Sequence, residues 1–200
     1  MVRFAKMLTL VLAFAVVAGC SKPPEVEIAA ANTSIQAAKS AEAEMYVPKA
    51  YRAAMDSLNA ATAAKTEQDA KFVLFRSYGK SKEMFVRADA IAKQVATDAA
   101  AEKARVKNEV TQMLADTKVL LDSVQVAVNK APVGKGNKAD IELIKSDLMS
   151  VIAAYDDANM EFNNGKYLTA RSKISVVKQK ADGILVEVQT ATDKVKKGRR

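Results

Sequence analysis

The chain has 200 residues, a formal net charge of +8 and a hydrophobic content of 50%, yet aromatic residues make up only 6% of it. It contains no His, no Trp and a single Cys. The absence of His removes the commonest general base and metal ligand, and an Ala-rich chain with few Gly and Pro favours helices over sheets. We therefore expect a helical protein that is not an enzyme and that has no catalytic residue, no metal site and no cofactor.

The first residues have the features of an export signal. Arg3 and Lys6 precede an apolar run over residues 7–17, and small residues follow the run. This order is typical of a signal peptide that is removed, and the run is shorter than the roughly 20 residues that a membrane-spanning helix needs. We expect residues 1–19 to be cleaved off, which would lower the net charge from +8 to +6 because two cations and no acid leave.

The tetrapeptide Val17-Ala18-Gly19-Cys20 closes this segment and contains the only cysteine. It resembles the lipobox of bacterial lipoproteins, in which an aliphatic residue, a small residue and Gly precede the modified Cys. The resemblance implies cleavage between Gly19 and Cys20, a diacylglycerol on the Cys20 sulfur and a fatty acyl chain (palmitate) on its new amino group. Two acyl signals give a stable membrane anchor. The alternatives are a buried structural thiol and ordinary secretory cleavage beside a chance cysteine.

The expected tether, residues 20–24, contains Pro23 and Pro24. Consecutive prolines favour an extended polyproline geometry of about 3.1 Å per residue, so the folded part should begin close to the lipid headgroups. Ser21 follows the lipobox cysteine. In lipoproteins that resemble the enterobacterial ones, Asp at this place retains the protein in the inner membrane, so Ser21 favours the periplasmic face of the outer membrane.

The first bundle is expected over residues 25–98. Its first helix should begin near Glu25, because Pro24 suits a helix entry and acidic residues occupy the first turn. Pro48 should end that helix and open a second one, which stops near Lys65. The expected inner face of the first helix consists of Ile28, Ala31, Ile35, Ala38 and Met45.

The third expected helix is unusually long. Thr66 is expected to cap it, and from residue 69 to residue 130 the chain has no proline and only one glycine, Gly79. A pattern of this length is typical of a coiled coil or of a helix that two bundles share. Gly79 or the polar stretch 98–107 could break it, so its continuity stays open. The apolar residues at helical spacing that predict it are Phe72, Phe75, Phe85, Ile91, Val95, Val106, Val110, Met113, Leu114, Leu121, Val124 and Val128.

The second bundle is expected over residues 99–196. A loop at 131–137 precedes the fourth helix, which Asn137 can cap, and Gly165 sits where a helix can end in the left-handed conformation. The fourth helix should bury Ile141, Ile144, Leu148, Ile152, Tyr155 and Phe162. The fifth has the clearest heptad: Tyr167, Ala170, Ile174, Val177, Ala181, Ile184, Val188, Ala191 and Val195.

The two halves have similar patterns, so the expected fold is all-α: an elongated pair of tandem, coiled-coil-like three-helix bundles that share a long central helix. In the first half, the Ala-rich segments 28–31 and 35–39 and a Tyr-x-Pro at 46–48 resemble a family of uncharacterised bacterial lipoproteins. Their helical domain is catalogued as a domain of unknown function. The resemblance covers about residues 20–100 and implies no particular activity.

Neighbouring carboxylates are the candidates for acid–base chemistry: Asp156, Asp157 and Glu161, and Glu42 with Glu44. Paired carboxylates do such work only in a pocket that shifts their pKa values. On an exposed helix face we expect these groups to point apart and to stay solvated. The tyrosines at helical spacing are expected in half-buried core positions rather than in a binding patch: Tyr51, Tyr155 and Tyr167.

These observations favour an exported, membrane-anchored protein that acts as a non-catalytic scaffold or adaptor of the cell envelope. Its expected partners are the lipid bilayer, through Cys20, and other envelope proteins or peptidoglycan. The heptad faces could also pair between chains and give a homo-oligomer. Because the positive charge is spread along every helix and export is expected, nucleic acid is not an expected ligand.

Two alternatives remain. The excess of Lys and Arg, with the basic tail at residues 197–200, could bind an anionic envelope polymer such as peptidoglycan or lipopolysaccharide, or the tail could simply be solvated. The residues expected to touch such a surface are Lys194, Lys196, Lys197, Arg199 and Arg200. Residues 165–167 followed by Ala170 also echo the turn of tetratricopeptide repeats, although the fourth helix is longer than a unit of about 34 residues allows.

Overall fold

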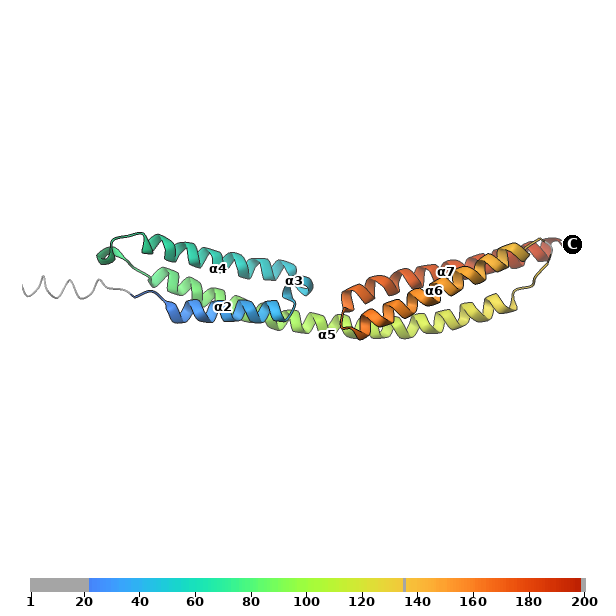
Figure 1. Cartoon of the computed structure of the whole chain (residues 1–200), viewed down its shortest axis with the longest axis horizontal. Helices are drawn as coiled ribbons and strands as arrows, with labels where there is room; N and C mark the ends of the chain where they lie inside the picture. The colour runs from blue at the N-terminus through green and yellow to red at the C-terminus, as the bar shows by residue number, and fades with distance from the viewer. Residues whose placement is uncertain (1–21, 135, 199–200) are drawn as a thin grey trace, which may run out of the picture. The chain divides into compact units, whose positions relative to one another are not determined.

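The computed structural model describes residues 22–134 and 136–198, and within them every regular element is a helix (Figure 1). In chain order these are α2 (Glu25–Ser40), α3 (Ala43–Tyr46), α4 (Pro48–Asp69), the short 3₁₀ turn η1 (Val73–Phe75), α5 (Gly79–Lys130), α6 (Lys138–Asn163) and α7 (Tyr167–Gly198). The all-α prediction with tandem bundles is therefore confirmed. No helix in the described part of the chain combines the length and the apolar character that crossing a bilayer requires.

The chain forms two compact units, which divide after Glu102. Unit 1 contains α2, α3, α4 and the N-terminal part of α5, and unit 2 contains the remainder of α5 with α6 and α7. The continuity that the sequence left open is resolved, because α5 is a single helix from Gly79 to Lys130. The polar stretch 98–107 does not interrupt it, and Gly79 is its first residue rather than a break within it.

Alanine dominates the core of unit 1. The completely buried alanines come from every helix of the unit: Ala31, Ala38, Ala43, Ala54, Ala61, Ala88, Ala92 and Ala99. Larger buried hydrophobic side chains are few, and they are Ile35, Tyr46, Tyr78, Phe85 and Val95. Because the side chain of alanine is a single methyl group, the helices of this unit can pack closely. There is then little room for larger side chains at these positions.

The connection between α2 and α4 differs from the prediction. The first helix ends at Ser40 instead of continuing to Pro48, and Glu42 then adopts a positive φ of 59°. This left-handed residue changes the direction of the chain before the single turn of α3, so the helical spacing no longer applies. Met45, predicted to be in the core, is 57% exposed, and Ala43 and Tyr46 are buried instead.

The segment between α4 and α5 is also different from the prediction. Thr66 does not cap a new helix: it lies inside α4, where its hydroxyl donates to the Thr62 carbonyl over 3.0 Å. The next helix begins ten or more residues later than expected, at Gly79. As a result Phe72 and Phe75, predicted to be core residues, are 67% and 75% exposed.

Unit 2 has a core of larger aliphatic side chains, and the heptad predicted for α7 is confirmed, with half-buried residues at its two ends. The buried members of α5 and α6 are Val106, Val110, Leu114, Leu121, Val124, Val128, Ile141, Ile144, Leu148, Val151 and Ala158. Ile152, predicted to be buried, is half-buried because Val151 takes the central position. Gly165 has a φ of +78°, as its predicted role at the end of α6 requires.

Asn137 precedes α6 as predicted, but its side chain makes no capping hydrogen bond to that helix. The side chain is buried and points back into the loop, where its Oδ1 accepts from the Gly134 amide over 2.8 Å. Its amide nitrogen donates to the Pro132 carbonyl at 2.8 Å and to the Ala191 carbonyl at 3.1 Å. Asn137 therefore joins the loop to α7 instead of closing the first turn of α6.

Candidate functional site

The described chain enters unit 1 at Lys22, and Pro24 is already buried. The tether and the first turn of α2 line a shallow groove together with the start of α5, where Tyr78, Gly79 and Lys82 lie. Across this groove the Lys82 ammonium is 3.0 Å from a Glu27 carboxylate oxygen, and this contact lowers the pKa of Glu27. The N-terminal tether and the start of α5 therefore occupy the same end of unit 1 (Figure 1).

Asp69, the last residue of α4, is the centre of a polar network at this end. Its Oδ2 is 2.7 Å from the Lys65 ammonium, and its Oδ1 accepts a 2.6 Å hydrogen bond from the Tyr78 hydroxyl. The bond from Lys65 and then the bond from Tyr78 hold the pKa of Asp69 below its ordinary value. The same carboxylate raises the pKa of Tyr78, so the phenol stays protonated and keeps donating.

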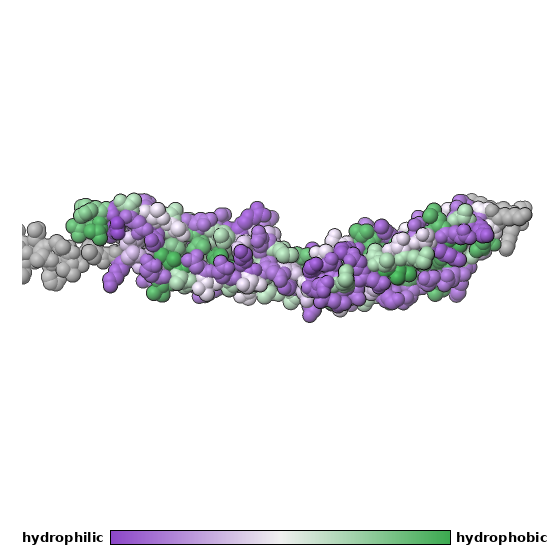
Figure 2. Space-filling view, in the orientation of Figure 1, coloured by the Kyte–Doolittle hydropathy of each residue, from purple (hydrophilic) through white to green (hydrophobic). Residues whose placement is uncertain are grey.

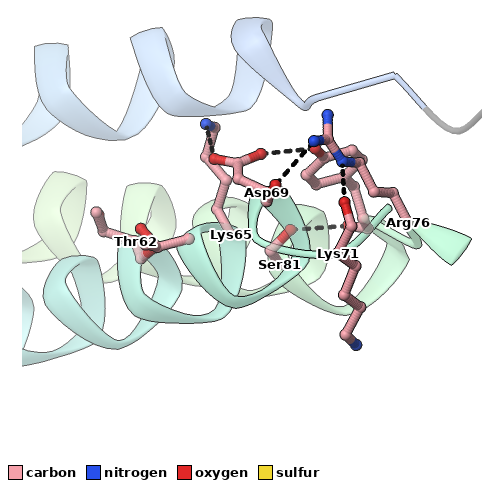
Figure 3. A network of polar contacts seen from close by, with 8 residues as sticks. Thr62, Lys65, Asp69, Lys71, Arg76 and Ser81 are labelled. Atoms are coloured by element: carbon pink, nitrogen blue, oxygen red, sulfur yellow. Dashed lines mark hydrogen bonds and ion pairs between the residues drawn. The ribbon is translucent and has the colours of Figure 1, made fainter. Parts of the chain in front are cut away.

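Arg76 also binds the backbone of the segment between α4 and α5, as Figure 3 shows. Its Nε donates to the Lys71 carbonyl over 2.9 Å, and its Nη2 donates to the Asp69 carbonyl over 2.8 Å. The Asp69 carbonyl ends α4 and the Lys71 carbonyl lies just beyond it, so one guanidinium binds a helix-terminal acceptor and a loop acceptor together. The Ser77 amide also donates to the Gln68 Oε1 over 3.2 Å. We call these contacts of Asp69 and Arg76 the polar base of the loop.

Beyond the polar base the loop exposes four consecutive apolar residues, Phe72–Phe75, which we call the apolar tip. Val73 and Leu74 are each 47% exposed, and the two flanking phenylalanine rings are 6.3 Å apart. Figure 2 shows the hydrophobic surface gathered where α4 joins α5. Sequence reasoning missed this tip. The available signal was the unbroken run of apolar residues, because a helix face repeats every three or four residues and does not place four neighbours on one side.

The predicted lipidation and cleavage residues, Cys20 and Gly19, lie outside the described residues. Their distance from the fold is nevertheless limited by covalent geometry. Two residues of extended chain reach at most roughly 7 Å, so a group attached at Cys20 cannot be far from Lys22. The first described residue, Lys22, and the loop that carries the apolar tip lie at the same end of unit 1 (Figure 1).

The predicted basic surface is partly neutralised. The Lys194 ammonium is 2.8 Å from an Asp140 carboxylate oxygen, and Lys196 is 3.7 Å from Asp193. The remaining predicted contacts, the Lys197 side chain with Arg199 and Arg200, lie outside what the structure describes. Of the predicted contact residues, the two whose side chains are described, Lys194 and Lys196, therefore each form an ion pair within unit 2.

The carboxylates of α6 take part in an ion-pair cluster with α7. The Lys173 ammonium is 2.7 Å from Asp157 and 3.1 Å from Glu161, and Lys166 is 3.1 Å from the other oxygen of Glu161. These contacts lower the pKa of Glu161, with the hydrogen bond from Lys173 as the largest cause, and raise that of Lys173. Asp156 is exposed on the same helix. Shifted pKa values of this kind are as typical of structural ion pairs as of active sites.

The other predicted residues are dispersed. Glu42 and Glu44 lie at the start of α3 in unit 1, and the α6 carboxylates belong to unit 2. Within the described residues, no group of three or more His, Cys, Asp or Glu side chains is arranged to hold a metal ion. The tyrosines predicted to be half-buried are half-buried: Tyr51, Tyr155 and Tyr167.

Two of these tyrosines connect helices of unit 2. The Tyr155 hydroxyl donates to the Leu114 carbonyl over 3.2 Å, which links α6 to α5. The centroid of the Tyr167 ring lies 5.3 Å from that of Phe162, and the Lys107 ammonium is 6.0 Å from the Tyr167 centroid.

Comparison with protein-family models, with curated proteins and with solved structures gives no match for this chain.

Proposed function

We propose that this protein is an exported lipoprotein that acyl chains on Cys20 hold at a membrane surface, where its helical units serve as a non-catalytic adaptor or scaffold of the cell envelope. The observation that carries the proposal is the tetrapeptide Val17-Ala18-Gly19-Cys20 after a charged and then apolar segment. An export signal followed by this tetrapeptide supplies both the route to the membrane and the site of attachment.

The position of the tether supports this assignment. Only Ser21, Lys22, Pro23 and Pro24 separate the tetrapeptide from the first turn of α2, and Pro24 is already buried against unit 1. A protein anchored at Cys20 would therefore hold this end of unit 1 close to the headgroups. Ser21 in place of Asp supports the periplasmic face of the outer membrane as the location, by resemblance to enterobacterial lipoproteins.

The adaptor role is supported by how the charged side chains are used. The carboxylates and lysines with shifted pKa values join one helix to another or neighbouring turns of one helix, as Glu27 with Lys82 and Glu161 with Lys173 do. Side chains engaged in this way stabilise a helical surface, and such a surface can present binding sites for other envelope proteins.

Metabolic labelling with a clickable fatty acid tests the anchor. We expect the wild-type protein to take up the label and to remain in the membrane fraction, and Cys20→Ala to do neither. Since the chain has only this cysteine, no other sulfur can replace it. A wild-type protein without label, or label retained in Cys20→Ala, would contradict the proposal. Ser21→Asp is the companion variant, and it should be labelled normally but move to the inner-membrane fraction.

Crosslinking in intact cells tests the adaptor role separately. Envelope proteins should be joined reproducibly to the lipidated protein and not to a control lipoprotein of similar abundance. Capture of no protein, from probes placed on both units, would contradict the adaptor role while leaving the anchor intact.

A further inference from the structure

The apolar tip needs a partner that the described chain does not provide. Its two aromatic and two aliphatic side chains are all close to half exposed or more, and they are contiguous. Single exposed apolar residues are ordinary on protein surfaces, but a contiguous group on a protruding loop is typical of a contact site for another molecule or a membrane.

We propose that the apolar tip inserts into the interfacial region of the lipid bilayer, as a second membrane contact beside the anchor at Cys20. The choice of membrane rests on the proposed function, because the anchor decides which bilayer lies nearby. The affinity of the tip for lipid is a property of the Phe72–Phe75 side chains themselves and can be measured independently.

The position of the tip favours lipid over a protein as the occupant. The tether residues Lys22–Pro24 and the start of α5 line one groove, and the tip lies on the loop that leads into α5. The chain from Lys22 to Cys20 reaches only roughly 7 Å, so acyl chains at Cys20 would hold the bilayer beside this end of unit 1. Attachment through one site makes a second contact with the same surface effectively intramolecular, which strengthens it greatly.

The composition of the loop suits a membrane interface. Lys71 and Arg76 flank the tip, and no acidic residue lies between them. Arg76 keeps its charge while its hydrogen bonds go to backbone carbonyls. Aromatic rings at the level of the headgroups, with Lys or Arg beside the phosphates, are the usual arrangement where a protein meets a bilayer.

The polar base presents the tip outward in a fixed conformation. Arg76 binds the carbonyls of Asp69, at the end of α4, and of Lys71, just beyond it. Tyr78 is hydrogen-bonded to Asp69 and is itself only 2% exposed. A loop that is already ordered loses little conformational entropy when it binds. Insertion would also fix how unit 1 faces the membrane, since attachment at a single point leaves its orientation free.

The absence of tryptophan from the chain allows a direct test. In Phe75→Trp the indole is the only tryptophan, at a position that is 75% exposed and so tolerates the larger ring. The matched control is Met45→Trp, which places the same probe on α3, at the other end of unit 1 and also in an exposed position (Figure 1). Both full-length proteins are purified from cell membranes and reconstituted in phosphatidylethanolamine–phosphatidylglycerol vesicles with brominated acyl chains.

We expect the tryptophan at position 75 to be quenched by the brominated acyl chains several-fold more than the one at position 45. Equal quenching at the two positions would overturn the proposal. Phe72→Trp serves as a second probe of the same tip if Phe75→Trp loses its helical circular dichroism. Crosslinking from position 75 to an envelope protein, without quenching by lipid, would assign the tip to a protein partner and also overturn the proposal.

The mass of the same reconstituted protein separates this result from the proposed anchor. Acylated protein with an unquenched tryptophan at position 75 would refute the tip and leave the anchor standing. Unacylated protein with a quenched tryptophan at position 75 and an unquenched one at position 45 would support the tip and refute the anchor.

Discussion

The Tyr78 hydroxyl and the Asp69 carboxylate are joined by a 2.6 Å hydrogen bond across nine residues of chain. The bond connects the last residue of α4 to the residue before α5, so it closes the loop that carries the apolar tip. Lys65 holds the other carboxylate oxygen at 2.7 Å, which fixes the orientation of Asp69. The conformation of the loop therefore depends on a contact between two side chains at its ends.

Removing that hydroxyl should loosen the loop. In Tyr78→Phe, Asp69 loses a donor, and we expect a lower Tm together with faster amide exchange over residues 70–78. Tyr51→Phe is the control, because it removes a hydroxyl from a half-buried tyrosine elsewhere in unit 1. Thermal melts followed by circular dichroism, with hydrogen exchange by mass spectrometry, measure both effects. Unchanged exchange in Tyr78→Phe would show that the bond does not hold the loop.

Stability should fall in acid. The pKa values of Asp69, Asp89 and Glu161 are all lowered by hydrogen bonds from partner side chains, starting from ordinary values of 3.8 for Asp and 4.5 for Glu. A carboxylate with a lower pKa in the folded state contributes stability that is complete above its ordinary pKa and is lost as the pH falls through the folded-state value. We therefore expect Tm to be nearly constant from pH 7 to about 5.5 and to decrease towards pH 3.

Asp89→Asn provides the matched variant for this pH dependence. Asp89 accepts a 2.5 Å bond from Ser34 on α2 and lies 2.8 Å from Lys93. The neutral amide cannot titrate, so the variant should have a lower Tm at pH 7 and a smaller decrease between pH 5 and pH 3. A decrease as steep as that of the wild type would mean that Asp89 does not contribute to acid sensitivity.

The alanine core of unit 1 should reject larger side chains. Ala92 is completely buried in the cluster that joins α2, α3, α4 and α5. Ala92→Leu inserts three carbon atoms between closely packed helices, and overpacking of this kind costs about 1–3 kcal/mol. Urea denaturation measures the cost, and Ala90→Leu, on the exposed face of the same helix, is the control. A stabilising Ala92→Leu would indicate a cavity at this site.

The core of unit 2 should be destabilised when a buried side chain is made smaller. Leu148 of α6 is 2% exposed, and Ile144 and Val151 on the same helix are buried as well. Leu148→Ala leaves a cavity, and such substitutions cost about 2–5 kcal/mol. Met149→Ala, one position along on the exposed face, should be nearly neutral. Urea denaturation of both variants tests the difference, and equal effects would contradict the described packing.

Asn137 should matter more than its place in a loop suggests. Its side chain makes three hydrogen bonds, to Gly134, Pro132 and Ala191. Asn137→Ala leaves these backbone groups without that partner, and each buried unsatisfied group costs about 1–3 kcal/mol. Asn129→Ala, on the exposed face of α5, is the control. A neutral Asn137→Ala in chemical denaturation would show that water replaces the side chain.

Much of the helical architecture is predictable because local signals determine it. Pro48 opens α4, Gly165 ends α6 with a positive φ, and the heptad of α7 supplies one face of unit 2. These features depend on residues that are close together in the chain, so spacing alone reveals them. The side of each helix that is buried follows from the same periodicity.

The loop at the candidate site is not predictable in the same way. Phe72 and Phe75 match a helical spacing, but in the structure this segment is a loop that Arg76, Ser77 and Tyr78 bind to the residues around the end of α4. Glu42 likewise ends α2 through a left-handed conformation that its sequence neighbours do not indicate. The error in the loop arises because contacts of side chains override local periodicity.

The account depends most on the covalent attachment of lipid at residue 20, and the intact mass of the mature protein extracted from membranes measures it most directly. We predict a chain that begins at Cys20 and carries the added mass of a diacylglycerol and one fatty acyl group. A mature chain that begins elsewhere, or one that retains an unmodified Cys20 thiol and is recovered without detergent, would contradict the account.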